Sequence, residues 1–196
     1  MRRRMIGGQT VSNGIYILHT NGKLYTYDKW DRSQRNEAVG VALISDNSSF
    51  VISGIEFKNR SWSNTSGSIQ GVTTATSSDE AKKDFNGFQN TQSIAEYTHV
   101  SAAYECTVTQ FKNGQMGYLA SVGEWMEIIN NLDEINRCMS LIDGLDIDEG
   151  ATSYWTSTQY NYEKAWLVTY NGNEFYPSDE RKTSPSYAIR VISQLI

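Results

Sequence analysis

Short apolar runs and polar–apolar alternation mark the first quarter of the chain, and both patterns are typical of β-strands. Residues 14–19 and 23–27 are two such segments, and the Asn21-Gly22 pair between them favours a two-residue turn because both positions accept positive φ. Residues 38–44 are almost continuously apolar and rich in β-branched side chains, which predicts a buried strand. The shorter run over 49–53 is expected to return beside it.

The pattern changes in the middle of the chain. Residues 59–79 are rich in Ser, Thr, Asn and Gly, with Trp62 as the one anchor, and predict a long surface loop or an insertion that orders against the body. A helix is expected next over 79–90. Its predicted core-facing residues are Ala81, Phe85 and Phe88.

Three further helices are expected. A helical piece over 91–105 is followed by one over 122–131, which begins with a capping box of Ser121 and Glu124. The third covers 133–141.

The last third, residues 151–196, superposes two patterns. Trp166, Val168 and Tyr170 recur with a period of two, so they are expected to share one face of a strand, while Leu167 points the other way. After the turn at 171–173 come side chains with no common chemistry, which no core requires. They are Phe175, Tyr176, Ser178, Arg181, Thr183, Ser184 and Ser186. A regular scaffold under an irregular, aromatic-rich surface is typical of recognition, whereas catalysis needs particular groups in fixed geometry.

Four aromatic residues in this region allow two interpretations, burial or exposure. They are Tyr160, Tyr162, Phe175 and Tyr176. The alternating anchors already supply a core face, so an outward cluster is favoured. Exposed aromatic side chains on a rigid sheet give a large contact area at a low cost in conformational entropy.

Composition and charge limit the function classes. The 196 residues suffice for one domain with a full core or for two small ones, and we expect a flexible tail over 1–13 and a single domain over 14–196. The formal net charge of −5 argues against a nucleic-acid partner, which requires a basic face. No run is long enough to span a membrane, and the N-terminus lacks the apolar segment of a secretory signal. We therefore expect synthesis in the cytoplasm, without membrane insertion.

Candidate chemistry is sparse. Cys106 and Cys138 could form one disulfide, but two free, buried thiols are the preferred interpretation. The acidic stretch over 143–150 lacks calcium-loop spacing, so a solvated loop is favoured over a metal site. His19 and His99, the only imidazoles, have no nucleophile or carboxylate at motif spacing. The sequence therefore predicts a protein that is not an enzyme and uses no cofactor or metal.

Several motifs resemble the C-type lectin-fold variable proteins of diversity-generating retroelements in phages and gut bacteria. In the last third these are Tyr154-Trp155-Thr156-Ser157-Thr158-Gln159-Tyr160, Ala165-Trp166-Leu167-Val168-Thr169-Tyr170, Asn171-Gly172-Asn173 and Tyr187-Ala188-Ile189-Arg190-Val191. The apolar segments over 14–25 and 38–44 with Trp30, and the run Ala120-Ser121-Val122-Gly123-Glu124-Trp125, also resemble parts of these proteins.

The resemblance implies an α+β, C-type lectin-like fold with antiparallel sheets and two or more helices. It also implies that the strand at 14–19 pairs with the one at 187–193. Function would then be non-enzymatic ligand binding in phage adsorption or bacterial surface recognition, on a virion or a cell surface. The partner would be a protein or glycan on a cell surface, and an oligomer is compatible with it. The alternative is an undiversified structural subunit of a phage fibre or surface appendage.

In this family a template repeat is copied with errors at adenines, and the copy replaces the variable region, here about 151–196. Errors in an Asn codon reach Phe, Ser, Tyr, Leu, Pro, Arg, Thr or Asp. The candidate ligand-binding positions are Tyr160, Tyr162, Leu167, Thr169, Asn171, Asn173, Phe175, Tyr176, Ser178, Arg181, Thr183, Ser184 and Ser186. Five neighbours cannot come from an Asn codon, namely Glu163, Lys164, Glu174, Glu180 and Lys182.

Scaffold and site are expected to separate within this region. The predicted buried set is Trp155, Trp166, Val168 and Tyr170. The predicted exposed face consists of Leu167, Thr169, Asn173, Phe175, Tyr176 and Ser178.

Overall fold

The computed structural model describes residues 4–6, 8–147, 153–171 and 174–196. The strands are β1 (Arg4–Ile6), β2 (Gln9–Val11), β3 (Gly14–His19), β4 (Leu24–Tyr25), β5 (Ala38–Ile44), β6 (Ser49–Arg60), β7 (Gly117–Leu119), β8 (Ser153–Gln159), β9 (Lys164–Tyr170), β10 (Phe175–Arg181) and β11 (Tyr187–Gln194). The helices are α1 (Ser78–Ala81), α2 (Gly87–Tyr97), α3 (Ala102–Thr107), α4 (Val122–Asn130) and α5 (Leu132–Leu141), with 3₁₀ turns at Tyr27–Lys29 and Arg32–Glu37.

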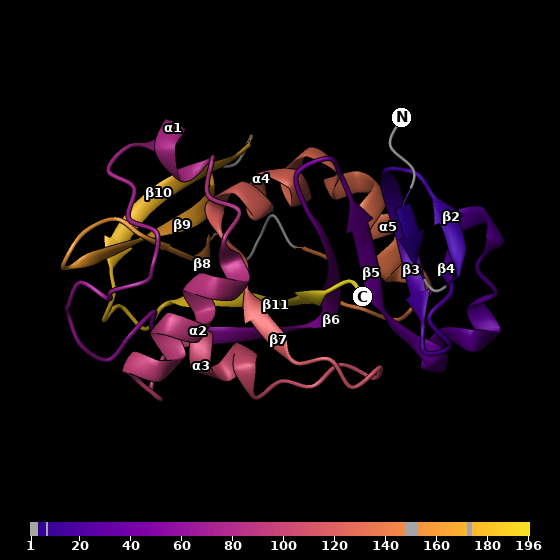
Figure 1. Ribbon diagram of the computed structural model, residues 1–196, viewed down its shortest axis with the longest axis horizontal. Helices are drawn as coiled ribbons and strands as arrows, with labels where there is room; N and C mark the ends of the chain where they lie inside the picture. Colours follow the sequence, from indigo (N-terminus) through magenta and orange to yellow (C-terminus); the bar gives the residue numbers. More distant parts are fainter. Residues whose placement is uncertain (1–3, 7, 148–152, 172–173) are drawn as a thin grey trace.

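One large sheet organises the described residues. Its strands follow the order β10-β9-β8-β11-β6-β5-β3-β4, and β7 pairs separately with β11. All pairings are antiparallel except the one between β8 and β11. In Figure 1, β11 runs between the β8–β10 group on the left and the β3–β6 group on the right. The predicted α+β class is confirmed, and the arrangement does not contradict a C-type lectin-like fold.

The predicted pairing of the strand at 14–19 with the one at 187–193 is wrong. β3 pairs with β4 and β5, whereas β11 pairs with β6, β7 and β8. Two strands, β5 and β6, therefore separate the first long strand from the last. Both segments have the apolar character of interior strands, but this character does not specify the partner.

The N-terminal segment predicted as a flexible tail contains a hairpin. β1 pairs with β2 in antiparallel register from Ile6 opposite Gln9 to Arg4 opposite Val11. Ile6 and Val11 are both buried. Burial of these two apolar side chains explains why part of this segment is ordered against the body.

The helices form two groups around the sheet. α5 contacts β3 and β5 while α4 contacts β8 and β9, and the pair α2–α3 contacts β7. Two of the largest buried side chains are Trp62 and Trp125, both fully inaccessible. Both predicted free thiols are confirmed as buried, at Cys106 and Cys138. None of the helices in the described part of the chain is long and apolar enough to cross a membrane.

The capping box predicted at the start of α4 is confirmed. The Glu124 carboxylate accepts from the Ser121 backbone N–H at 2.8 Å, and it also accepts from the Tyr118 hydroxyl at 2.9 Å. Burial raises the pKa of Glu124 to about 7. Such a buried, satisfied carboxylate fixes the start of α4 beneath the β8–β9 strands.

The helix predicted directly after the 59–79 segment differs from the observed structure. The helix expected over 79–90 is limited to the short α1, and a second helix starts at Gly87. Phe88 is consequently 39% exposed rather than in the core, although Ala81 is fully buried as expected. The break in the helix rotates the later residues onto a different face.

A buried ion pair braces the junction of the two halves of the sheet. Arg190 in β11 is inaccessible, and its guanidinium donates to the Glu56 carboxylate in β6 at 3.1 Å. The Tyr154 hydroxyl in β8 donates to the same carboxylate at 2.6 Å. Arg190 also donates to the Leu145 and Asp146 carbonyls at 2.9 and 2.8 Å. The network links three strands where β8 and β11 share a single paired position.

Candidate ligand-binding site

The hairpin of β9 and β10 carries much of the predicted site, and its register decides which side chains share a face. Phe175 pairs with Tyr170, and pairing continues to Arg181 opposite Lys164. Directly paired residues of antiparallel strands point to the same side of the sheet. Phe175 therefore lies on the face of Tyr170, only 7% exposed, and the prediction that it shares an exposed face with Leu167 is wrong.

The opposite face of the hairpin carries Thr169, Tyr176 and Ser178 together with Leu167. The Thr169 hydroxyl lies 2.6 Å from that of Ser178 and 3.0 Å from that of Ser153 in β8. Three hydroxyls thus form a chain across three strands. Tyr176 beside them is 38% exposed.

Leu167 is only 2% exposed, so its predicted exposure is also wrong. It belongs to an apolar cluster that includes Trp155, while Trp166 and Val168 pack on the other side of β9. A strand covered on both faces has no exposed side, and strict alternation does not reveal this. The predicted burial of Trp155, Trp166 and Val168 is confirmed, whereas Tyr170 is only half-buried.

The other candidate positions are more accessible. The exposed ones are Tyr162, Asn171, Tyr176, Arg181, Thr183 and Ser186, and the half-buried ones are Tyr160, Thr169, Ser178 and Ser184. Asn173 lies outside the described residues.

These positions do not gather at one place. Tyr162 follows β8 and Thr183 follows β10, so both lie at one end of the hairpins, whereas Asn171 lies at the other. β9 and β10 each contain seven residues, so the two ends are about 20 Å apart. The predicted site therefore divides into two areas.

A pocket of about 540 Å³ opens at the 171–175 end, between the α4–α5 junction and the hairpin. Its lining residues are Met126, Ile129, Asn130, Asn131, Leu132, Asp133, Glu134, Tyr170, Glu174 and Phe175. We call this the hairpin pocket. Its volume is within the range of small-ligand sites, about 300–1,000 Å³.

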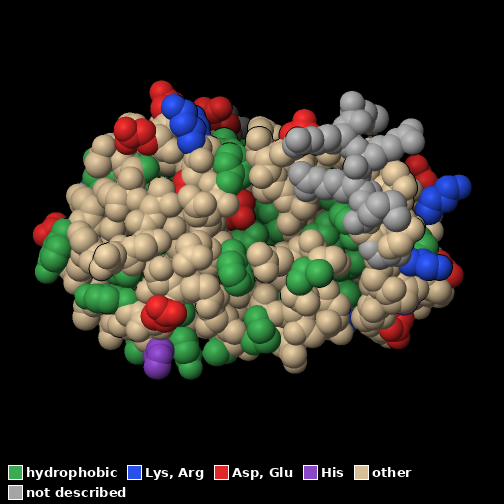
Figure 2. All heavy atoms as spheres, in the orientation of Figure 1, with side chains coloured by type: hydrophobic (Ala, Val, Ile, Leu, Met, Phe, Trp, Pro, Cys, Tyr) green, Lys and Arg blue, Asp and Glu red, His purple; other side chains and the backbone are tan. Residues whose placement is uncertain are grey.

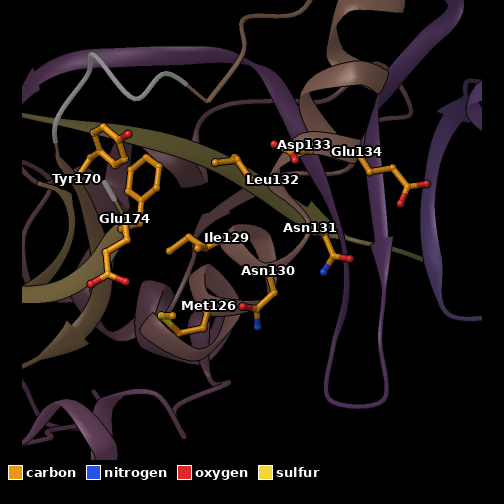
Figure 3. A pocket seen from close by; sticks show the side chains of 10 residues that line it. Met126, Ile129, Asn130, Asn131, Leu132, Asp133, Glu134, Tyr170 and Glu174 are labelled. Atoms are coloured by element: carbon orange, nitrogen blue, oxygen red, sulfur yellow. The ribbon is translucent and has the colours of Figure 1, made fainter. Parts of the chain in front are cut away.

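Aromatic rings and carboxylates give the hairpin pocket its chemistry. The ring centroids of Tyr170 and Phe175 lie 5.0 Å apart, and Figure 3 shows Tyr170 on one side of the pocket. Met126 and Ile129 also line the pocket, and Asp133 lies on the other side of it from Tyr170. The arrangement can hold the apolar part of a ligand and place carboxylates near a polar or charged part of the same ligand.

The other end of the hairpins contains a buried lysine that the sequence pattern did not indicate. Lys182 is inaccessible, and its ammonium donates to the Gly67 carbonyl and, at 2.6 Å, to the Gln159 side-chain oxygen. The ammonium also lies 4.7 Å from the ring centroid of Trp62. Burial lowers the pKa of Lys182 to about 8. The lysine fastens the 59–79 segment to the strands and offers nothing to an external ligand.

The remaining polar candidates lie elsewhere. Asp143 forms an ion pair with Arg35 at 2.6 Å, and residues 148–150 of the predicted acidic loop lie outside the described residues. Within the described residues, no group of three His, Cys, Asp or Glu side chains could hold a metal ion. The His19 ring packs against Tyr25. The His99 ring packs against Tyr104 in α3.

The visible surface in Figure 2 carries acidic and basic side chains that are spread apart outside the grey atoms. No continuous basic area is seen on that face.

No family model matches the chain, and no curated protein matches it at a significant level. Among solved structures, the fold is similar to that of a fimbrial protein from Bacteroides ovatus ATCC 8483, with a TM-score of 0.62 and 15% sequence identity. The match covers 93% of this chain and 48% of the fimbrial protein. The chain thus spans about half the length of that protein, and the similarity concerns the fold.

Proposed function

We propose that this chain is a ligand-binding part of a bacterial surface appendage and that it catalyses no reaction. One observation carries the proposal: one face of the β9–β10 hairpin borders an aromatic, acidic pocket, and the opposite face presents exposed residues such as Tyr176. Groups held on a well-packed scaffold bind with little loss of conformational freedom. The partner would be a protein or glycan on a cell surface.

The similarity to a fimbrial protein supports a surface location and favours a bacterial appendage over a phage virion. It also supports a role that is structural or recognising rather than enzymatic. Among the described residues, those that line the hairpin pocket supply carboxylates and amides but no histidine, cysteine, serine or lysine side chain. Binding is the function that this set of groups suits best.

We further propose that a retroelement diversifies this surface and that the variation is confined to the accessible candidate positions. Leu167 and Phe175 are buried, so a change to Asp or Arg there would place an unpaired charge in the core. Two residues that an Asn codon cannot yield have structural contacts: Lys164 pairs with Asp179 at 2.5 Å, and Lys182 is buried. Variation confined to the exposed residues would spare this scaffold.

The DNA around the gene tests diversification directly. We expect a near-copy of the codons for residues 151–196 that differs mainly at adenines, with variation concentrated at exposed positions such as Tyr162, Tyr176 and Arg181. Variation that falls equally on Leu167 and Phe175, or no near-copy at all, would contradict diversification and leave the binding role to be tested separately.

An undiversified structural subunit is the second candidate, and the similarity to a fimbrial protein also favours it. Binding and assembly distinguish the two functions. The binding role predicts that the labelled protein binds saturably to bacterial or host cells as a discrete species. The structural role predicts self-assembly into filaments, which electron microscopy would detect, without saturable cell binding.

A further inference from the structure

Resting on the proposed ligand-binding function, we propose that the hairpin pocket takes a cationic side chain, a lysine or arginine of a protein partner. Apolar side chains, two aromatic rings and three carboxylates line this one pocket. Each of these features matches one part of a long basic side chain.

The charge of the pocket matches the charged head. Asp133, Glu134 and Glu174 line it, and none of its described lining residues is a lysine or arginine. Among the described residues, none of the ion pairs involves any of these three carboxylates. Glu174 approaches from the hairpin and Asp133 from the start of α5, on different sides of the pocket (Figure 3). A cation bound between them would offset part of this negative charge.

The apolar part of the pocket matches the alkyl stem. Met126, Ile129 and Leu132 line it from the α4–α5 junction, and lysine and arginine bury their methylene groups along such surfaces. Tyr170 and Phe175 add two ring faces, which attract a cation within about 6 Å of a ring centroid.

The polar groups fit a neutral glycan less well. Asn131 lines the pocket, but its amide nitrogen already donates to the Glu127 carbonyl at 2.8 Å. The Asn130 amide and the Tyr170 hydroxyl can donate as well as accept, but the three carboxylates, which dominate the polar lining, only accept. Sugar hydroxyls need both donors and acceptors, whereas an ammonium or guanidinium needs only acceptors.

A pair of peptides tests the charge requirement. The probes are acetyl-Gly-Lys-Ala-Lys-Gly-amide and the same peptide with both lysines Nε-acetylated, which keeps the stems and removes the charges. We expect the lysine peptide to bind at low ionic strength, with perturbed NMR signals at Ile129 and Leu132, and the acetylated peptide to bind at least tenfold more weakly. Equal affinities, or perturbations confined to other regions, would overturn the proposal.

Matched charge variants test the location. The triple variant Asp133→Asn/Glu134→Gln/Glu174→Gln should bind the lysine peptide at least tenfold more weakly than the wild type. Asp28→Asn/Asp79→Asn/Glu96→Gln, which removes the same charge from three exposed positions outside the pocket, should change its affinity by less than twofold. Equal losses would show attraction by overall charge and overturn the assignment.

Two further measurements keep the outcome clear. Glu174→Lys changes an exposed residue of the turn, so it should preserve the melting temperature and abolish peptide binding. Unchanged peptide affinity in this variant would overturn the proposal. Binding of a neutral oligosaccharide that Glu174→Lys abolishes, without peptide binding by the wild type, would also overturn it while leaving the ligand-binding function in place. That function fails separately if the wild type binds no cell surface.

Discussion

At the scale of single residues, Trp166 shows how the β9 strand is held. Its side chain is 4% exposed, and the indole N–H donates to the Ala75 carbonyl at 2.9 Å. It also packs edge-on against Tyr160, with ring centroids 5.3 Å apart. The tryptophan therefore joins β9 to the segment before α1.

Replacing Trp166 with Ala should lower the free energy of unfolding by about 3–5 kcal/mol, because a large buried side chain is lost and a cavity remains. Tyr162, which is 61% exposed, provides the control: Tyr162→Ala should stay within about 0.5 kcal/mol of the wild type. Urea titrations of the three proteins measure both values. A Trp166→Ala loss as small as that of Tyr162→Ala would contradict the burial described.

Lys182 predicts a dependence of stability on pH. Its folded-state pKa of about 8 lies below the ordinary value of 10.5, so between these pH values the unfolded chain holds a proton that the folded protein has released. The contribution of Lys182 to the free energy of unfolding therefore rises with pH in this window, by up to about 1.4 kcal/mol per pH unit. Below about pH 8 both states hold the proton, and this gain in stability is absent.

The difference between the wild type and Lys182→Met isolates this effect. Groups with raised pKa, such as the Cys138 thiol at about 11, act in the opposite direction but are present in both proteins. Denaturant titrations between pH 7 and pH 10 should show the wild type gaining stability relative to the variant. A difference that does not change with pH would count against a buried, desolvated ammonium.

At the scale of secondary-structure elements, a local sequence signal predicts the structure where all the residues that it depends on are close together in the chain. The Ser121–Glu124 capping box predicted the start of α4, and the apolar run at residues 38–44 is β5. The burial of Leu167 depends on Trp155 in a neighbouring strand, which local alternation does not contain. Lys182 gave no signal, because a lysine after an exposed strand normally faces water.

Removing residues 1–20 should abolish cooperative folding, for a reason that differs from the predicted pairing of the chain ends. The deletion removes β3, whose Ile15, Ile17 and Leu18 are buried, and leaves β5 without one of its neighbours. Each fully buried side chain of this kind contributes about 1.5–3 kcal/mol. Thermal unfolding followed by circular dichroism measures the effect, and a normal cooperative transition in the truncated protein would contradict this topology.

At the scale of the whole molecule, the sequence predicted the α+β class but not the order of the strands. Apolar character places β3 and β11 in a sheet, yet the choice of partner depends on contacts between distant parts of the chain. The candidate site stays a prediction, and the division of its residues between two ends of the hairpins follows from register. The contribution of α4 and α5 to the hairpin pocket follows from tertiary packing, which no local motif encodes.

Folding should not require a metal ion. Within the described residues no ligand cluster is present, and Asp143 is already engaged by Arg35. Addition of a chelator such as EDTA should leave the melting temperature unchanged in calorimetry. A drop of many degrees that added calcium reverses would show a metal site in the acidic stretch over 143–150.

Cell binding by two matched variants tests the central claim, recognition at the 171–176 end of the β9–β10 hairpin, most directly. One variant is Asn171→Ala/Glu174→Ala/Tyr176→Ala, and its control at the other end is Tyr162→Ala/Arg181→Ala/Thr183→Ala; all six positions are exposed. Flow cytometry with labelled proteins should show saturable binding by the wild type and the control and its loss in the first variant, at unchanged melting temperatures. Undiminished binding by the first variant would contradict the account.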